Sequence, residues 1–271
     1  MSPCDEIRTD IMASMLSEIG FESFVPDNEG LTAYIKAEIF DLDKITDTVA
    51  NFPIPTDTTV NNTLIEGQDW NAEWEKNYFK PIVIGNRCVI HSSFHTDIPD
   101  AEYRIVIDPR MAFGTGHHST TSLMIGRILS TDLSGKKVID MGTGTGILAI
   151  LCLMRGAAQV TGIEIDPMAQ ANAVDNTILN NAEAVTMLTG DASLLSEIYK
   201  ADIFLANINR NIITADIERY ADACAPGANL FLSGFYNEDV PVIIDAATRA
   251  GFKFDDVTLD NNWACVKLTK S

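Results

Sequence analysis

Three alternating glycines follow an apolar run and an acidic residue near the middle of the chain. Residues 138–141 have the sequence V-I-D-M, and Gly142, Gly144 and Gly146 come directly after them. Glycine lets a backbone turn through positive φ and approach a ligand closely. In doubly wound sheets the ligand lies at the carboxyl ends of the strands. The spacing therefore predicts a strand that turns sharply beneath a nucleoside-like cofactor, with Asp140, Gly142 and Gly144 beside it.

The same glycines distinguish between two kinds of cofactor. A nicotinamide-binding loop requires G-x-G-x-x-G, or Ala at the last position. Counted from Gly142, that position is Ile147; counted from Gly144 it is Ala149, which matches but starts too late after the strand. A carboxylate at Asp140 would also repel a pyrophosphate at the following helix. The loop therefore favours S-adenosylmethionine and methyl transfer, and a nicotinamide-dependent oxidoreductase is the alternative.

Three polar residues follow later strands of the same expected sheet. Glu164 lies 22 residues after Gly142, where a carboxylate can accept hydrogen bonds from both hydroxyls of a ribose. Asp191 follows the third strand and is our candidate for the adenine amino group, although acids are common in turns. Asn207 ends the fourth strand. Its uncharged amide can orient the cofactor and a substrate amine without a salt bridge that would keep the amine protonated; a turn asparagine is the alternative.

Alternating helices and strands must position these residues. Beyond residue 119 such alternation predicts an α/β fold with a mainly parallel, doubly wound sheet and helices on both faces. Only residues 260–262 separate the last two strands, so these strands must pair antiparallel. We also expect Asp166 to cap the helix that follows it. The expected elements are helices 119–130, 146–155, 167–180, 211–224 and 238–250, and strands 137–141, 159–164, 184–189, 201–207, 228–233, 253–259 and 263–268.

A small α+β unit is expected to precede this domain. Apolar residues recur at helical spacing from Ile7 to Ile19, and the patterns that follow predict strands 21–25 and 31–40 and a helix 41–51. No catalytic constellation is evident in this unit.

A linker and a short lead-in connect the two parts. Residues 53–62 are rich in Pro, Thr, Asp and Asn, which is typical of a linker, and residues 69–80 predict an amphipathic helix. Three strands, 82–84, 88–91 and 103–107, are expected to form a small antiparallel lead-in. The expected division of the chain is a small domain at 1–54, a linker and helix at 55–80, and a catalytic domain at 81–271.

The charge of the chain restricts its partners. The net charge is −19 and the isoelectric point is near 4.4, so the long-range field repels nucleic acids and anionic membranes. The first 60 residues contain 12 acidic and 3 basic residues. This concentration indicates either a solubilising face or a docking surface for a basic partner.

Cysteine usage and the N-terminal sequence predict a cytoplasmic protein. The five cysteines are odd in number and show no C-x-x-C spacing, so neither a disulfide framework nor a metal site is indicated. The chain begins without a basic segment followed by an apolar one, and its strongest apolar stretch, 147–154, is too short to span a bilayer. Neither export nor membrane insertion is expected.

A second block carries a family resemblance. Residues 108–121 have the sequence D-P-R-M-A-F-G-T-G-H-H-S-T-T. This block resembles D-P-x-x-A-F-G-T-G-x-H-x-T-T, the signature of the PrmA family, which methylates ribosomal protein eleven of the large subunit, at the stalk base. The resemblance also covers residues 69–80, 139–146, 162–167, 206–208, 232–234 and Trp263.

The resemblance implies a class I, Rossmann-like methyltransferase that uses S-adenosylmethionine. It implies a cytoplasmic enzyme that trimethylates lysine on a basic ribosomal protein, with an N-terminal domain that recognises this substrate; from the charge of the chain we expect no direct contact with nucleic acid. The family's cofactor contacts fall on Thr121, Gly142, Glu164 and Asn207. A methyltransferase of another protein or of a small-molecule amine is the alternative.

Four departures from the family pattern stand out. Glu164 occupies a position where the family commonly has Asp, which lengthens the arm and keeps the carboxylate. Ser119 replaces a usual Pro, and residues 209–211, N-R-N, replace more apolar ones, which leaves details of the substrate site open. The family's recognition domain usually opens with a strand, whereas this chain begins almost at its first helix. Either the domain lacks an edge strand or the chain starts downstream of the natural beginning.

Two residues of the signature are candidates for chemistry. We expect Phe113, with the glycines of residues 114–116 as hinges, to cover the cofactor. His118 is a candidate general base and, with Asn207, one of two candidate catalytic residues. A histidine at this position can equally cap or brace the start of the following helix.

Overall fold

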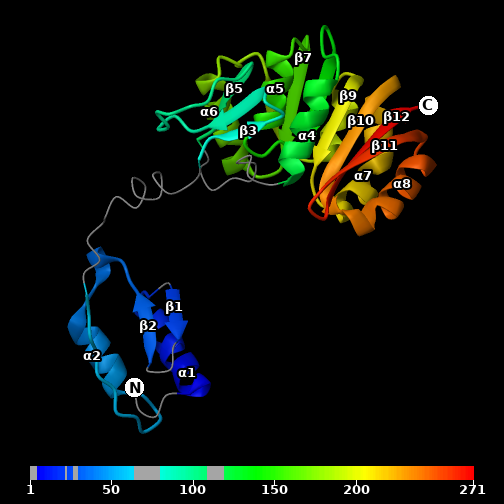
Figure 1. Cartoon of the computed structure of the whole chain (residues 1–271). Coiled ribbons are helices and arrows are strands. Elements are labelled where there is room, and N and C mark those ends of the chain that lie inside the picture. The colour runs from blue at the N-terminus through cyan, green and yellow to red at the C-terminus, as the bar shows by residue number, and fades with distance from the viewer. Residues whose placement is uncertain (1–4, 22, 27–29, 64–79, 109–118) are drawn as a thin grey trace. The chain divides into compact units, whose positions relative to one another are not determined.

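A computed structural model of the chain describes residues 5–21, 23–26, 30–63, 80–108 and 119–271. The chain divides into two compact units, Met1–Glu73 and Trp74–Ser271, and each is described by itself (Figure 1). The predicted helix at 69–80 falls almost wholly outside the described residues, and the finer division at residues 54 and 80 stays a prediction.

The first unit is a small α+β arrangement. Its core is apolar and is formed by Met12, Leu16, Phe21 and Ile45. The strand predicted over 31–40 is too long, because the four-residue partner strand offers no pairing beyond Tyr34. A 3₁₀ turn follows. The elements are α1 (Glu6–Ser17), β1 (Ser23–Pro26), β2 (Leu31–Tyr34), η1 (Ala37–Ile39) and α2 (Leu42–Ala50).

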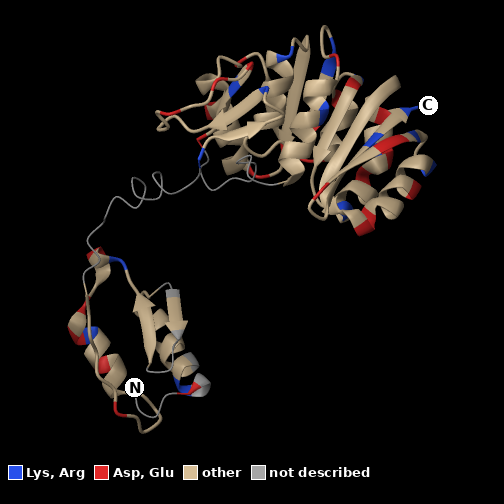
Figure 2. Cartoon of the chain, in the orientation of Figure 1, with Lys and Arg blue, Asp and Glu red and all other residues tan. Residues whose placement is uncertain are grey.

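Side chains at both helix starts satisfy backbone donors in this unit. The Asp5 carboxylate accepts a hydrogen bond from the backbone N–H of Arg8 at 2.9 Å. Asp41 does the same for Asp43 and Lys44 at 3.1 and 3.2 Å, as expected for Asp at an N-cap. Asp43 and Asp47 of α2 are exposed, and Figure 2 marks the acidic residues of this helix in red.

A three-stranded lead-in sheet opens the second unit. It consists of β3 (Ile82–Ile84), β4 (Cys88–His91) and β5 (Tyr103–Val106). The first pair is antiparallel as predicted, but β4 and β5 are parallel, with Cys88 opposite Tyr103. The prediction of a fully antiparallel lead-in is therefore wrong. Residues 92–102 are long enough to return the chain to the same end of the sheet before β5 begins.

The main sheet has seven strands in the order β11-β12-β10-β9-β6-β7-β8. Strands β6 to β10 run parallel, and β12 lies antiparallel between β10 and β11 (Figure 1). The predicted class, a Rossmann-like α/β fold with an antiparallel last strand, is confirmed. The strands are β6 (Lys137–Met141), β7 (Gln159–Glu164), β8 (Thr186–Thr189), β9 (Ala201–Asn207), β10 (Cys224–Tyr236), β11 (Phe252–Asp260) and β12 (Trp263–Lys270).

Helices cover both faces of this sheet. Successive residues of a strand point to opposite faces; Val138 of β6 accordingly lies in the core beneath α4 and α5, and Ile139 in the core beneath α7 and α8. The helices are α4 (Ser119–Ser130), α5 (Ile147–Met154), α6 (Pro167–Leu179), α7 (Arg210–Ala223) and α8 (Val240–Arg249), with 3₁₀ turns η2 (Ala192–Glu197) and η3 (Asn237–Asp239). Across the described ranges, no helix is both long and apolar enough to cross a membrane.

Candidate active site

The glycine-rich loop after β6 turns as its sequence predicts. The backbone N–H groups of Gly142 and Thr143 donate to the carbonyl of Ile163 on β7, at 2.8 and 3.0 Å. Gly142, Gly144 and Gly146 have φ angles of +70°, +55° and +81°. The loop is therefore tied to the next strand and passes through conformations that favour glycine.

Asp140 lies buried under this loop. One carboxylate oxygen accepts a hydrogen bond from the Thr143 hydroxyl at 2.6 Å. The other oxygen is buried and accepts no hydrogen bond of ordinary geometry among the residues that the structure describes. Burial raises the pKa of Asp140 to about 7; the Thr143 hydrogen bond opposes this rise, the nearby Glu164 carboxylate adds to it, and the backbone N–H of Ala149 opposes it weakly. A cationic group or a hydrogen-bond donor at the free oxygen would favour the charged form.

Glu164 joins the end of β7 to the glycine-rich loop. Its two oxygens accept hydrogen bonds from the backbone N–H groups of Gly144 at 2.9 Å and Asp166 at 3.1 Å. Each carboxylate oxygen has a second lone pair, so both can still accept from hydroxyl groups. Asp166 in turn accepts from the N–H of Met168 at 2.8 Å and starts α6, which confirms the predicted cap.

Asp191 lies at the end of β8, where its carboxylate already has a partner. It accepts a hydrogen bond from the backbone N–H of Ser193 at 2.8 Å and caps η2. Hydrogen bonds from the Ser193 side chain and backbone lower the pKa of Asp191. Asp191 therefore caps a turn, which was one of the two roles that its sequence position allowed. Its contact with an adenine stays a prediction.

Asn207 ends β9 with a buried side-chain oxygen. This oxygen has no hydrogen-bond partner within the described ranges. Buried amide oxygens are nearly always paired, so an unpaired one beside a glycine-rich loop marks a place where a ligand donor would be accepted. In register, Asn207 lies opposite Ser233 of β10, and the neighbouring N–H of Ile208 donates to the Ser233 carbonyl at 3.1 Å.

Gly234, for which the sequence predicted no role, fixes the backbone next to Asn207. It is the extra residue of a β-bulge between Ser233 and Phe235 and has a φ of +95°. A Cβ atom at this position would lie 2.3 Å from the Ile208 carbonyl oxygen. An isolated glycine within a strand pattern indicates a bulge or a close backbone approach, and here it is both.

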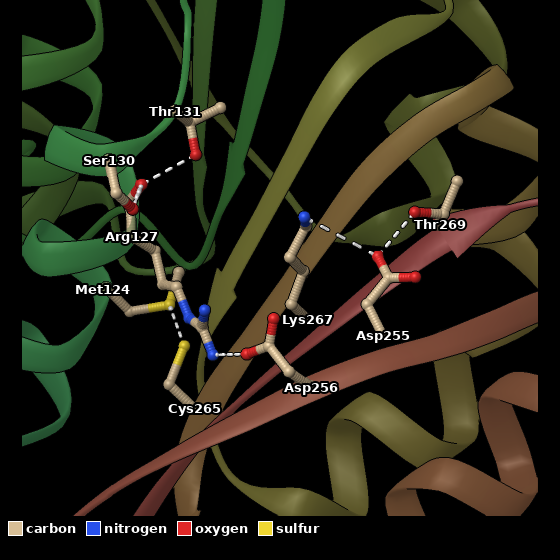
Figure 3. Close-up of polar contacts among 9 residues, drawn as sticks. All are labelled: Met124, Arg127, Ser130, Thr131, Asp255, Asp256, Cys265, Lys267 and Thr269. Carbon is tan, nitrogen blue, oxygen red and sulfur yellow. Dashed lines mark hydrogen bonds and ion pairs between the residues drawn. The ribbon is translucent and has the colours of Figure 1, made fainter.

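Thr121 lies in the first turn of α4 and is 2% exposed. Residues farther along α4 contact β11 and β12, the two strands at the antiparallel edge of the sheet. Arg127 forms an ion pair with Asp256 of β11, and the Met124 sulfur lies 3.6 Å from the Cys265 sulfur of β12 (Figure 3). Because Thr121 belongs to the same helix, these contacts of α4 with two strands more than 130 residues later in the sequence help to position it.

Comparisons with known proteins decide the family. A family model described as "Ribosomal protein L11 methyltransferase (PrmA)" matches residues 11–271. The chain belongs to this family. A ribosomal protein L11 methyltransferase from Phocaeicola vulgatus is 51% identical, covering 98% of this chain and 95% of the relative. One from Bacteroides fragilis is 49% identical over the same shares.

A solved structure agrees with this assignment. The ribosomal protein L11 methylase from Lactobacillus delbrueckii subsp. bulgaricus has a TM-score of 0.65 and 25% identity to this chain, covering 71% of this chain and 100% of its own. PrmA-family proteins are methyltransferases that use S-adenosylmethionine, so the predicted activity class and cofactor are confirmed. The nicotinamide alternative is wrong.

The PrmA signature itself is described only in part. Asp108, which opens it, accepts hydrogen bonds from the backbone N–H and the hydroxyl of Ser93 at 2.8 and 2.6 Å. Phe113 and His118 lie outside the described residues, so their predicted roles stay predictions. Hydrogen bonds connect Asp140, Glu164 and the glycine-rich loop directly. Asn207 ends β9 on one side, and Asp191 follows β8 on the other.

Proposed function

We propose that this PrmA-family protein trimethylates lysine side chains of ribosomal protein L11 in the cytoplasm. The observation that carries the proposal is the buried, unpaired amide oxygen of Asn207 at the carboxyl end of β9. Its relatives from Phocaeicola vulgatus and Bacteroides fragilis are named ribosomal protein L11 methyltransferases. The substrate, the lysine specificity and the site residues are parts of the proposal.

The residues of the site fit the cofactor by their donor and acceptor types. S-adenosylmethionine supplies an activated methyl group on a sulfonium, and it carries ribose hydroxyls and an ammonium group. Glu164, held by two backbone N–H groups, would accept from the ribose hydroxyls. The free oxygen of Asp140 would receive positive charge, because a buried carboxylate is stabilised by a nearby cation. Gly142 and Gly144 would lie against the cofactor, with Thr121 and Asp191 at its edges.

Asn207 would prepare the amine for attack. A lysine with a pKa near 10.4 is mostly protonated at pH 7, so reaching the neutral amine costs about 4 to 5 kcal/mol. An amide oxygen can accept one N–H of the neutral amine and direct its lone pair, whereas a carboxylate would stabilise the ammonium form. Bound S-adenosylmethionine would supply the methyl group and keep the electrons of its carbon–sulfur bond on sulfur. In the first two transfers the amine proton would leave to water or to His118, and the third would release none.

The acidic N-terminal domain, residues 1–54, would recognise the substrate. The first 60 residues carry 12 acidic and 3 basic side chains, and a ribosomal protein is a basic partner of the kind that this charge attracts. The same charge disfavours direct contact with nucleic acid or an anionic membrane.

The deciding experiment is methyl transfer from radiolabelled S-adenosylmethionine to purified large-subunit proteins, with mass spectrometry to count methyl groups on each lysine. Label on L11 with a mass increase of three methyl groups supports the proposal. Label on another protein or a small amine instead favours the alternative substrates. Label on L11 outside lysine refutes the specificity.

A matched pair of asparagines tests the role of Asn207. Asn207→Ala should abolish most transfer. Asn209→Ala is the control, because the Asn209 side chain already accepts a hydrogen bond from the N–H of Ile212 at 3.1 Å as the cap of α7. That control should lose stability and keep its turnover. Equal turnover in the two variants would remove Asn207 from the mechanism.

A further inference from the structure

Three asparagines along one face of α6 bind the chain that leaves β5. Asn172, Asn176 and Asn180 are spaced by four residues, which places them on one side of a helix. Asn172 and Asn176 are 2% and 0% exposed. Asparagine is a weak helix former, so the two that are buried inside α6, Asn172 and Asn176, indicate a specific hydrogen-bonding task, and Asn180 continues the row as the C-cap of the helix.

The row matches the backbone of an extended segment. The Asn180 side chain accepts from the N–H of Val106 at 2.8 Å and donates to its carbonyl at 2.7 Å. Asn176 accepts from the N–H of Asp108 at 3.1 Å, and Asn172 donates to the Asp108 carbonyl at 2.8 Å. Four helical residues rise about 6 Å, and two strand residues span about 6.6 Å. The matching spacing lets the asparagine side chains bond alternate residues of the extended segment, Val106 and Asp108.

Asn176 makes a second connection. Its side-chain N–H also donates to the carbonyl of Thr145 at 2.9 Å, and Thr145 lies between Gly144 and Gly146 of the glycine-rich loop. One buried amide thus bonds both the cofactor loop and Asp108, the first residue of the PrmA signature. The hydrogen bonds of Asn180 go to Val106 and to the backbone carbonyl of Asn176.

We propose that Asn176 is a positioning residue for methyl transfer. Its side chain holds the glycine-rich loop and Asp108, the start of the signature segment, in fixed positions relative to each other. Cofactor affinity then depends on Asn176, although this residue belongs to α6 and not to the loop. Its two bonds use both ends of the amide: the oxygen binds Asp108 and the nitrogen binds Thr145. The inference rests on the use of S-adenosylmethionine by this chain.

The test compares three variants by calorimetric binding of S-adenosylhomocysteine, by thermal melting and by turnover. Asn176→Ala removes both bonds and should raise the Kd about tenfold, because it takes the Asn176 side-chain donor away from a buried loop carbonyl. Asn176→Asp keeps the acceptor for Asp108 and loses the donor to Thr145, so it should raise the Kd similarly. In both, the KM for S-adenosylmethionine should follow the Kd, while kcat at saturation changes less than about threefold.

Asn180→Ala is the matched control. It loses hydrogen bonds to the same strand and should lower the melting temperature as Asn176→Ala does, with a Kd within about twofold of wild type. A Kd that rises equally in Asn176→Ala and Asn180→Ala, or in neither, would overturn the proposal and leave the row a structural feature. If Asn176→Ala does not fold, Asn176→Asp decides alone. Failure of the wild type to bind S-adenosylhomocysteine would instead refute the cofactor assignment.

Discussion

Replacing Gly234 by alanine tests how the site holds Asn207. The new Cβ atom would lie 2.3 Å from the Ile208 carbonyl oxygen and 2.7 Å from both its carbonyl carbon and its nitrogen. All three are backbone atoms, so no side-chain rotation can relieve the contact. Ordinary contacts begin near 3.4 Å. The segment that carries Asn207 must therefore move by about 1 Å.

Two effects contribute to the expected loss of stability. A φ of +95° costs a residue with a Cβ about 1 to 2 kcal/mol, and forcing an extra carbon into a packed site costs about 1 to 3 kcal/mol more. Gly234→Ala should therefore lower the free energy of unfolding by about 2 to 5 kcal/mol. If Asn207 orients the substrate amine as proposed, its displacement by about 1 Å should reduce turnover by about two orders of magnitude.

Gly227 provides a control on the same strand. Its φ is +77°, and a Cβ atom there would meet nothing within 4 Å. Gly227→Ala should therefore show only the backbone penalty of about 1 to 2 kcal/mol. Urea unfolding of both variants isolates the contact with Ile208, and methyl transfer by the folded variants reports on Asn207. If the two alanine variants match in stability and turnover, the argument for a backbone contact at Asn207 is refuted.

Three further substitutions follow from the site. Asp140→Asn should flatten the pH dependence of the free energy of unfolding. Burial raises the pKa of Asp140 from 3.8 to about 7, so the native state binds the proton more tightly than the unfolded chain does. The wild type therefore loses up to about 4 kcal/mol of stability as the pH rises from 3.8 to 7. Glu164→Gln should raise the Kd of S-adenosylhomocysteine about 10- to 100-fold, since an amide N–H₂ would face a backbone N–H of Gly144 or Asp166. Asp166→Ala removes the cap of α6 and should cost about 1 kcal/mol of stability without changing that Kd.

Urea unfolding measures the stability of the Asp140 and Asp166 variants, and calorimetry measures the Kd of S-adenosylhomocysteine for the Glu164 and Asp166 variants. Unfolding of wild type and Asp140→Asn at pH 5, 6, 7 and 8 should give converging or crossing stabilities, and a constant difference across that range would contradict the burial argument. Asp166→Ala also serves as the control for Glu164→Gln, because it leaves the backbone N–H of residue 166 in place. Equal Kd values in these two variants would mean that Glu164 does not bind the ribose.

Elements with a local pattern could be predicted from the sequence. Strands β6 and β7 and helix α4 have the predicted bounds, because glycine and proline residues bound the two short strands in the sequence and α4 shows helical periodicity. Strand β10 extends beyond its prediction at both ends, and at its carboxyl end it reaches Tyr236, because Tyr236 pairs with Trp263, 27 positions later. Such pairing leaves no local signal. The parallel pairing of β4 and β5 was missed for the same reason.

The candidate site was predictable in its positions and less so in its contacts. Glu164 and Asn207 could be placed because parallel strands end at one edge of a sheet. The bonds from Glu164 to Gly144 and from Asn176 to Thr145 join segments 20 and 31 residues apart. They depend on how helix and loop pack, which residue type and spacing alone do not specify.

Ile208 explains how an unpaired amide can be held in place at Asn207. Its side chain lies over Gly142, where a Cβ atom would be 2.3 Å from the Ile208 Cγ2, and its backbone lies against Gly234. The N–H of Ile208 is bonded to the Ser233 carbonyl. The residue after Asn207 is therefore fixed on three sides by contacts that do not use the Asn207 oxygen. Because packing positions the backbone, that oxygen needs no internal hydrogen bond and stays available to a ligand donor.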